Sequence, residues 1–269
     1  MRFFSTRKPN LHKRYYTTRE DSDEYLVSNA QLGGYILLPL RSKVEIGPRG
    51  ARYYDLFLNL LSLGLYSRLV REIIERMDIK HGQSILDLGS GTGMNDCFMS
   101  ERVGAHGKIV GLDISDEMLS QSLKRCREYP NMCFEKQRIE LPLAYKQEFD
   151  KVFISFVLHG FEDDQKLGIM HNAHQALKPG GAFYILDYNE FDLEKVWFPL
   201  RWAFAHWECQ LAVEFLKLDI KEMLRNQGFT HLEQEFFFKG CLRLLKAVKP
   251  SVSPRQTGLG ITWINWKKP

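Results

Sequence analysis

Residues 84–95 limit what this chain can fold into more than any other stretch. They open with a short apolar run, residues 85–88, which has the length and composition of a buried parallel strand. A helical pattern begins near Met94. Between the two, glycine occupies every second position, at Gly89, Gly91 and Gly93. Glycines at such a turn let the backbone bend sharply and let a ligand approach the main chain closely.

Two acidic residues add to this signal. Asp87 lies inside the predicted strand, where a carboxylate is a poor host for phosphate and a good host for a cationic or amino-bearing ligand. Asp113 ends the next predicted strand, 108–113, and follows Gly93 by 20 residues. At that spacing a carboxylate reaches the ribose hydroxyls of a nucleoside. The alternatives are a flavin or nicotinamide site, or a glycine turn without a ligand.

Helices and strands alternate after this turn. The patterns predict helices over 93–103, 115–128 and 163–178, and strands over 108–113, 132–135, 149–156 and 182–187. A capped helix follows over 219–228, and residues 229–238 and 240–248 read as a terminal hairpin. Strands separated by helices indicate an α/β fold with a doubly wound, parallel sheet.

Composition excludes several classes of protein. Residues 1–19 contain six basic side chains and no acid, so the rest of the chain carries −2 of the overall +4 charge. Such a body is not a basic nucleic-acid binder. The five cysteines form no metal-binding or disulfide pattern, so we expect no metal and a reducing compartment. No apolar run reaches transmembrane length, and no feature indicates an oligomeric state.

The chain divides into three parts by pattern. Residues 1–50 read as a partly irregular N-terminal extension, 51–248 as the main domain, and 249–269 as a tail. Residues 53–78 have the period of helices, broken at Gly64. The basic N-terminus is either a frayed end in a cytoplasmic protein or a mitochondrial transit peptide.

The glycine stretch, Ile85-Leu-Asp-Leu-Gly-Ser-Gly-Thr-Gly93, resembles the first motif of class I S-adenosylmethionine-dependent methyltransferases. That resemblance spans about 52–248 and implies a Rossmann-like seven-stranded sheet of order 3-2-1-4-5-7-6. The segments Tyr54-Asp-Leu and Ser62-Leu-Gly-Leu-Tyr66 are similar to segments of the UbiE/Coq5-type quinone C-methyltransferases. The resemblance to this subgroup spans about 53–192. The implied cofactor is S-adenosylmethionine, and the implied contacts are Asp87, Gly89, Ser90, Gly91, Thr92, Gly93, Asp113, Ile114, Gln137, Arg138, Ser155 and Phe156.

The substrate end departs from that subgroup. Where its members read Phe-Gly-x-Arg-Asn, this chain reads Phe156-Val-Leu-His-Gly160, which places His159 in the position of the arginine. Histidine is a natural general base near neutral pH, so His159 is a candidate catalytic base, and His206 is its rival. The other interpretation of His159 is a group that only orients the substrate.

Residues 188–216 are rich in aromatic side chains, and Tyr188 and Trp202 are the candidate substrate contacts. Three interpretations are open: a lid over a flat or lipophilic acceptor, ordinary packing, and contact with a membrane surface. The leading hypothesis is a methyltransferase acting on a small aromatic or lipophilic, quinone-like molecule. The alternatives are a methyltransferase-fold binding or assembly protein, and a methyltransferase with a protein substrate.

Overall fold

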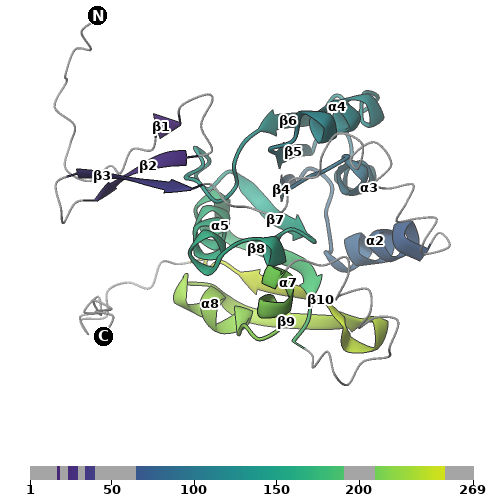
Figure 1. The fold of residues 1–269 in the computed structure, drawn as a ribbon. Helices are drawn as coiled ribbons and strands as arrows, with labels where there is room; N and C mark the ends of the chain where they lie inside the picture. The colour runs from purple at the N-terminus through teal and green to yellow at the C-terminus, as the bar shows by residue number, and fades with distance from the viewer. Residues whose placement is uncertain (1–16, 19–23, 30–33, 40–64, 191–209, 252–269) are drawn as a thin grey trace, which may run out of the picture. The chain divides into compact units, whose positions relative to one another are not determined.

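The computed structural model describes residues 17–18, 24–29, 34–39, 65–190 and 210–251 (Figure 1). The chain divides into two compact units, Met1–Lys43 and Val44–Pro269. The predicted helical stretch before Gly64, most of the predicted lid and most of the C-terminal tail lie outside the described residues.

The first unit contains a small antiparallel sheet. Its strands are β1 (Thr17–Thr18), β2 (Glu24–Asn29) and β3 (Gly34–Pro39), in the order β1-β2-β3. Sequence patterns do not predict these strands within the partly irregular extension 1–50. β2 pairs antiparallel with both β1 and β3, and Val27 lies opposite Ile36 in the register of β2 with β3.

The second unit is built on a seven-stranded sheet of order β6-β5-β4-β7-β8-β10-β9. Numbered from the glycine strand β4, this is the order 3-2-1-4-5-7-6, so the predicted fold is confirmed. Pairing is parallel from β6 to β8, whereas β10 runs antiparallel to both β8 and β9. The strands are β4 (Ser84–Leu88), β5 (Lys108–Asp113), β6 (Met132–Lys136), β7 (Phe149–Ser155), β8 (Leu177–Tyr188), β9 (Thr230–Phe237) and β10 (Leu242–Val248).

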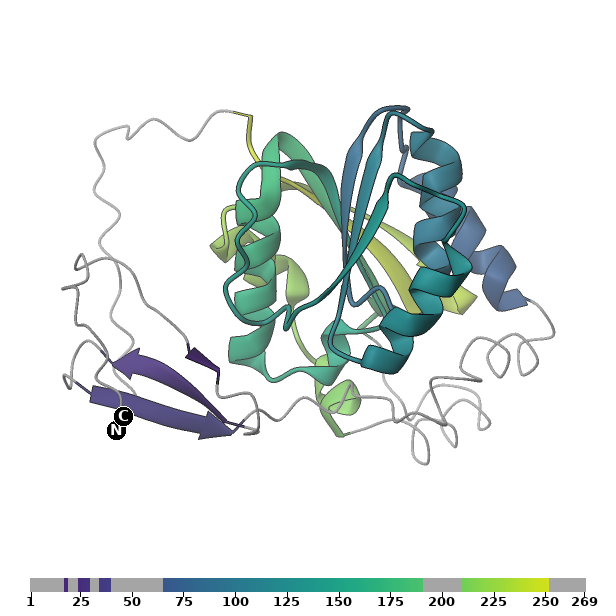
Figure 2. The same ribbon diagram turned by 90° about the horizontal axis from the view of Figure 1, so that it is seen from above.

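Helices cover both faces of this sheet. Figure 2 shows α2, α3 and α4 on one side and α5 and α8 on the other. Neighbouring residues of β4 pack into opposite layers, because successive side chains of a strand point to opposite faces. Ile85 joins the core under α2 and α3, and Leu86 joins the core under α5. The helices are α2 (Leu65–Arg76), α3 (Met94–Val103), α4 (Asp116–Arg125), α5 (Asp163–Ala176), α7 (Gln210–Phe215) and α8 (Ile220–Asn226).

The helix termini follow the polar residues that the sequence indicates. Ser115 caps α4 by accepting a hydrogen bond from the Met118 N–H, and Asp219 caps α8 through the Glu222 N–H. The predicted helix 163–178 is shorter in the structure, because α5 ends at Ala176 and β8 begins at Leu177, before the predicted strand 182–187. Pro179 disfavours a helical conformation at the residue before it, so the chain becomes extended earlier.

Candidate functional site

The glycine loop joins β4 to α3 at the carboxyl edge of the parallel strands. All three glycines have a positive φ: 85° at Gly89, 55° at Gly91 and 76° at Gly93. The N–H groups of Gly89 and Ser90 donate to the carbonyl of Leu112 at 2.8 and 2.9 Å, which ties the loop to the end of β5. The loop is thus fixed by the backbone at the edge where such sheets bind ligands.

Asp113 holds the same loop from the end of β5. One carboxylate oxygen accepts from the Gly91 N–H at 2.9 Å, and the other accepts from the Ser115 N–H at 2.8 Å. Burial raises the pKa of this carboxyl, and the backbone N–H groups oppose that shift. A carboxylate has about four acceptor positions, so these two bonds leave room for the predicted contacts with ribose hydroxyls.

Asp87 lies beneath the loop with its side chain fully buried. Both carboxylate oxygens have no hydrogen-bond partner among the described residues, and the same is true of the Ser90 hydroxyl. Burial is the main cause that raises the pKa of Asp87 well above its usual range. A buried carboxyl that the protein does not pair is suited to a ligand that brings a cation or a donor.

A second pair of side chains meets at the ends of β7 and β8. The ring Nδ1 of His159, in the single turn Leu158–Gly160, lies 2.8 Å from a carboxylate oxygen of Asp187. The other oxygen of Asp187 accepts the backbone N–H of His159 at 3.2 Å. The Asp187 side chain is 1% exposed and the His159 side chain is 14% exposed, so this pair is largely shielded from water.

Aromatic rings surround the histidine. The centroid of the His159 ring lies 5.0 Å from that of Tyr188 and 6.3 Å from that of Phe215. Tyr188 also contacts Phe156, with centroids 6.2 Å apart. Phe156 has a φ of 54°, an uncommon conformation for a side chain of this size. Ring-to-ring contacts of this kind stabilise the arrangement of these side chains around the imidazole.

The remaining predicted residues are divided between this edge and undescribed parts of the chain. Ser155 is buried at the end of β7, next to Phe156. Gln137 and Arg138 follow β6, with Gln137 exposed, and the Arg138 Nε lies 2.6 Å from an oxygen of Glu140. Their implied contact with the cofactor stays a prediction. Trp202 and His206 lie outside the described residues.

Two buried acids of this region were not predicted. Asp187 orients His159, and Asp96 lies in the first turn of α3 with both oxygens unpartnered. A signal was available for Asp187, because it is a polar residue at the carboxyl end of a predicted strand, as Asp113 is. Asp96 gave no signal, since an acid in the first turn of a helix is ordinary.

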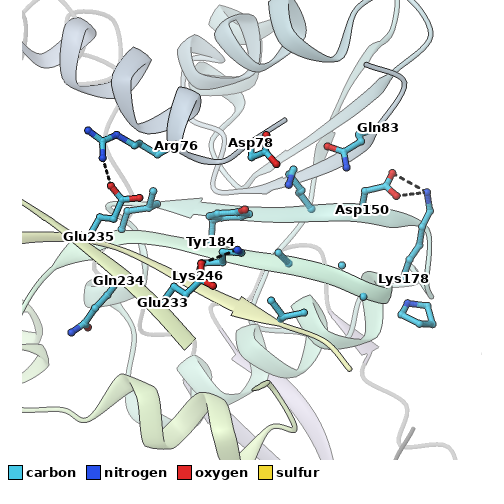
Figure 3. Close-up of a pocket in the computed structure, with 17 residues that line it drawn as sticks. Arg76, Asp78, Gln83, Asp150, Lys178, Tyr184, Glu233, Gln234, Glu235 and Lys246 are labelled. Carbon is cyan, nitrogen blue, oxygen red and sulfur yellow. Dashed lines mark hydrogen bonds and ion pairs between the residues drawn. The ribbon is translucent and has the colours of Figure 1, made fainter. Parts of the chain in front are cut away.

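A cavity of about 420 Å³ lies at the opposite edge of the sheet (Figure 3). It is bordered by the amino ends of β4, β7 and β8 and by β9 and β10, and most of its charged residues form ion pairs with one another. Lys178 binds Asp150 and Lys246 binds Glu233, each at 2.8 Å, and Arg76 binds Glu235. Its position excludes it as the site that the glycine loop forms, because ligands of such sheets bind at the carboxyl ends.

The sheet order, the glycine loop, Asp87 in β4 and Asp113 at the end of β5 define the class I methyltransferase fold. The model of the ubiE/COQ5 methyltransferase family matches residues 45–223. The chain therefore belongs to this family, and its cofactor is S-adenosylmethionine, as the sequence predicts. The unpaired carboxyl of Asp87 and the loop that Asp113 holds fit the amino and ribose groups of that cofactor.

Several relatives are named for quinone chemistry. The chain is 30% identical over 207 residues to the chloroplastic 2-phytyl-1,4-beta-naphthoquinone methyltransferase of Arabidopsis thaliana, covering 72% of this chain and 78% of that protein. It is 29% identical to a ubiquinone/menaquinone biosynthesis C-methyltransferase of Enterobacter, over 66% and 68% of the two chains. An uncharacterized methyltransferase of Synechocystis is 28% identical, over 71% and 87%.

Solved structures share the fold at lower identity. A methyltransferase from Aquifex aeolicus matches with a TM-score of 0.55 and 18% identity, over 76% of this chain and 99% of that one. The Haemonchus contortus phosphoethanolamine N-methyltransferase 2 matches with a TM-score of 0.61 and 18% identity, over 81% and 63%. These likenesses concern the fold alone. None of the described helices is long and apolar enough to cross a membrane.

Asp113→Ala should weaken cofactor binding. The change removes the charged acceptor predicted for the ribose and also releases the Gly91 N–H, and hydrogen bonds to charged groups contribute about 1.5–3 kcal/mol each. We expect the dissociation constant of S-adenosylhomocysteine, measured by calorimetry, to rise by roughly 10- to 150-fold. Asp116→Ala, an exposed carboxylate three residues away that pairs with Lys136, is the control. An unchanged affinity in Asp113→Ala would contradict the assigned contact.

Proposed function

We propose that this protein transfers a methyl group from S-adenosylmethionine to a small aromatic acceptor of the quinol type. The observation that carries this proposal is the His159–Asp187 pair, which lies among aromatic rings at the same sheet edge as the glycine loop. The names of two relatives, a naphthoquinone and a ubiquinone/menaquinone methyltransferase, support the acceptor class.

The role of Asp187 follows from its geometry. A buried carboxylate 2.8 Å from Nδ1 accepts the proton of that nitrogen and so selects the tautomer in which Nε2 is unprotonated. The second oxygen of Asp187 fixes the backbone of His159, so the ring cannot turn away freely. His159 is thereby prepared to accept a proton through Nε2, and Asp187 stabilises the imidazolium that results.

The reaction then needs little else from the protein. When bound, S-adenosylmethionine supplies a methyl group activated by its sulfonium. His159 removes the proton of an acceptor hydroxyl, which raises the electron density of the ring carbon next to it. That carbon would take the methyl group, its electron pair replacing the one that leaves with the sulfur of the donor. The ring carbon would then lose its own proton to water, while the imidazolium of His159 returns a proton to the ring oxygen. Tyr188, Phe215 and Phe156 exclude water and hold the acceptor flat.

An acceptor screen tests this proposal. Purified protein is incubated with methyl-labelled S-adenosylmethionine and, separately, with isoprenoid quinols that lack one ring methyl group, simple phenols and a protein extract. We expect label in the quinols, on carbon by mass spectrometry. Asp87→Asn, whose cofactor site is altered, is the negative control. Label only in the protein fraction, or in no fraction, would overturn the proposed acceptor and favour a protein-methylating or a binding role respectively.

A further inference from the structure

The cavity at the amino edge of the sheet takes no part in methyl transfer. Its volume of about 420 Å³ is that of a small-molecule pocket. Residues of β7, β8, β9 and β10 line one side, and the end of α2 with the turn after it lines the other (Figure 3). Tyr184 of β8 joins the two sides, because its hydroxyl donates to the Met77 carbonyl at 3.0 Å. The cavity is thus built from regular structure, at the end of the sheet opposite to the glycine loop.

The acids that line this cavity each have a cation of their own. Asp150 pairs with Lys178, Glu233 with Lys246 and Glu235 with Arg76 (Figure 3), and Asp78 pairs with Lys80. Lys151 is a further cation of the lining, and its ammonium forms no ion pair or hydrogen bond with any residue that the structure describes. The paired charges cancel, so the lining carries one positive charge without a partner.

Lys151 is buried in the wall of the cavity. The residue is only 7% exposed, and its Nζ lies 5.2 Å from the centroid of the Tyr184 ring. A ring attracts a cation modestly, which does not replace the hydration that a buried ammonium loses. Burial accordingly lowers the pKa of Lys151, and the carboxylate of Asp78 acts against this shift. A buried cation without a counterion at the wall of a cavity is suited to a ligand that brings a negative charge.

Gln83 contributes a second donor to the lining. Its amide oxygen accepts from the Lys80 N–H at 2.9 Å, which leaves the NH₂ group of the same amide as a donor. The nearby carboxylate of Asp150 is already occupied: it accepts from the Lys178 ammonium at 2.8 and 2.9 Å and from the Ser84 N–H at 2.8 Å. Lys151 and Gln83 therefore both offer donors, and a carboxylate or phosphate group offers the matching acceptors.

We infer that this cavity binds a small oxyanion, a carboxylate or a phosphate group, whose charge pairs with the Lys151 ammonium. The site is separate from the methyl-transfer site, because Lys151 lies near the start of β7 whereas Ser155 ends that strand beside the glycine loop's edge of the sheet. The inference does not depend on the acceptor proposed above. It assigns a second ligand to the protein, on the other end of the same strands.

Calorimetry with inorganic phosphate and, separately, with acetate measures this binding on the whole chain, with sodium chloride at equal ionic strength as the reference. We expect the parent to bind at least one of the two anions at a single site. Lys151→Met removes the charge and keeps a side chain of similar length, and it should weaken the anion by roughly 10- to 150-fold, the factor for a lost hydrogen bond to a charged group. Lys136→Met, an exposed lysine of β6 that pairs with Asp116, should bind as the parent does.

A second measurement needs no variant. Acetic anhydride modifies neutral amines, and mass spectrometry gives the extent of labelling at each lysine. A bound anion favours the protonated form of Lys151 and blocks access to it, so phosphate or acetate should slow labelling at Lys151 and leave Lys136 unchanged. This result would stand even if Lys151→Met failed to fold, which circular dichroism checks.

The outcomes decide the inference. A response to phosphate alone or to acetate alone would support it and identify the group that binds. Equal affinity in the parent and in Lys151→Met, or labelling of Lys151 that neither anion slows, would overturn it. Competition between the anion and S-adenosylhomocysteine would overturn it as well, because the anion would then lie at the glycine loop. A failed acceptor screen would leave this inference unaffected, since the two experiments use different ligands and different residues.

Discussion

His159→Ala should lower the rate of methyl transfer by about 10²–10⁴-fold, the range expected for the loss of a general base. Cofactor affinity should stay close to that of the parent, because the ring contacts Asp187, Tyr188 and Phe215, none of which is a predicted cofactor contact. Single-turnover rates with labelled cofactor measure the first quantity, and calorimetry with S-adenosylhomocysteine measures the second.

The pH dependence of this rate distinguishes a base from a packing group. A base must be unprotonated, so the rate of the parent should rise with pH as the imidazole loses its proton. This ascending limb of the pH–rate profile should be absent in His159→Ala. His174→Gln is a matched control on α5. Burial lowers the pKa of His174 to about 4, and its ring packs on Phe229, so it should leave the limb unchanged. His206→Ala tests the rival candidate.

Asp187→Asn should lower the rate of methyl transfer by less than His159→Ala does. Asparagine keeps the size of the side chain and can still accept a bond, but it brings no charge to stabilise the imidazolium. The apparent pKa of the ascending limb should move to lower pH, because a negative charge next to the ring has been removed. A merely structural Asp187 would change stability without moving this limb. Full activity of His159→Ala at every pH would leave both residues as orienting groups.

The sheet could be predicted because its signals are local. Buried parallel strands are short apolar runs, and the residues that end them are glycines or acids, so β4 and β5 were defined by composition alone. The strand order came from the family resemblance. The small sheet of β1, β2 and β3 was not predicted, because its short apolar runs lie in a polar segment.

The contacts of the site could not be predicted in the same way. His159 and Asp187 are 28 residues apart, and only the parallel pairing of β7 with β8 brings the ends of both strands together. The burial of Asp96 depends on how α3 leaves the glycine loop, which no spacing rule describes. Sequence motifs therefore identified the glycine loop and its two neighbouring acids, whereas the pairing of His159 with Asp187 needed the fold.

Replacing Gly91 or Gly93 of the loop by alanine should impair the protein in two different ways. An added Cβ at Gly93 would lie 2.9 Å from the Cβ and 3.0 Å from the Cα of Ser122, in the helix α4. At Gly91 it would meet no atom of the described residues within 4 Å. Both positions have a positive φ, which costs a side-chain-bearing residue about 1–2 kcal/mol. Gly93→Ala adds a clash with backbone, and overpacking costs about 1–3 kcal/mol more.

We therefore expect Gly93→Ala to lower the free energy of unfolding by roughly 2–5 kcal/mol and Gly91→Ala by about 1–2 kcal/mol, measured from urea midpoints. For ligand binding, in contrast, Gly91→Ala should have the larger effect of the two. Gly91 faces the open space over the loop where the cofactor is expected, so Gly91→Ala should weaken S-adenosylhomocysteine by about 5- to 150-fold, which corresponds to the same overpacking cost. Gly91→Ala that binds normally would mean that the cofactor does not cross this part of the loop, and the contacts assigned to it would have to move toward Gly89.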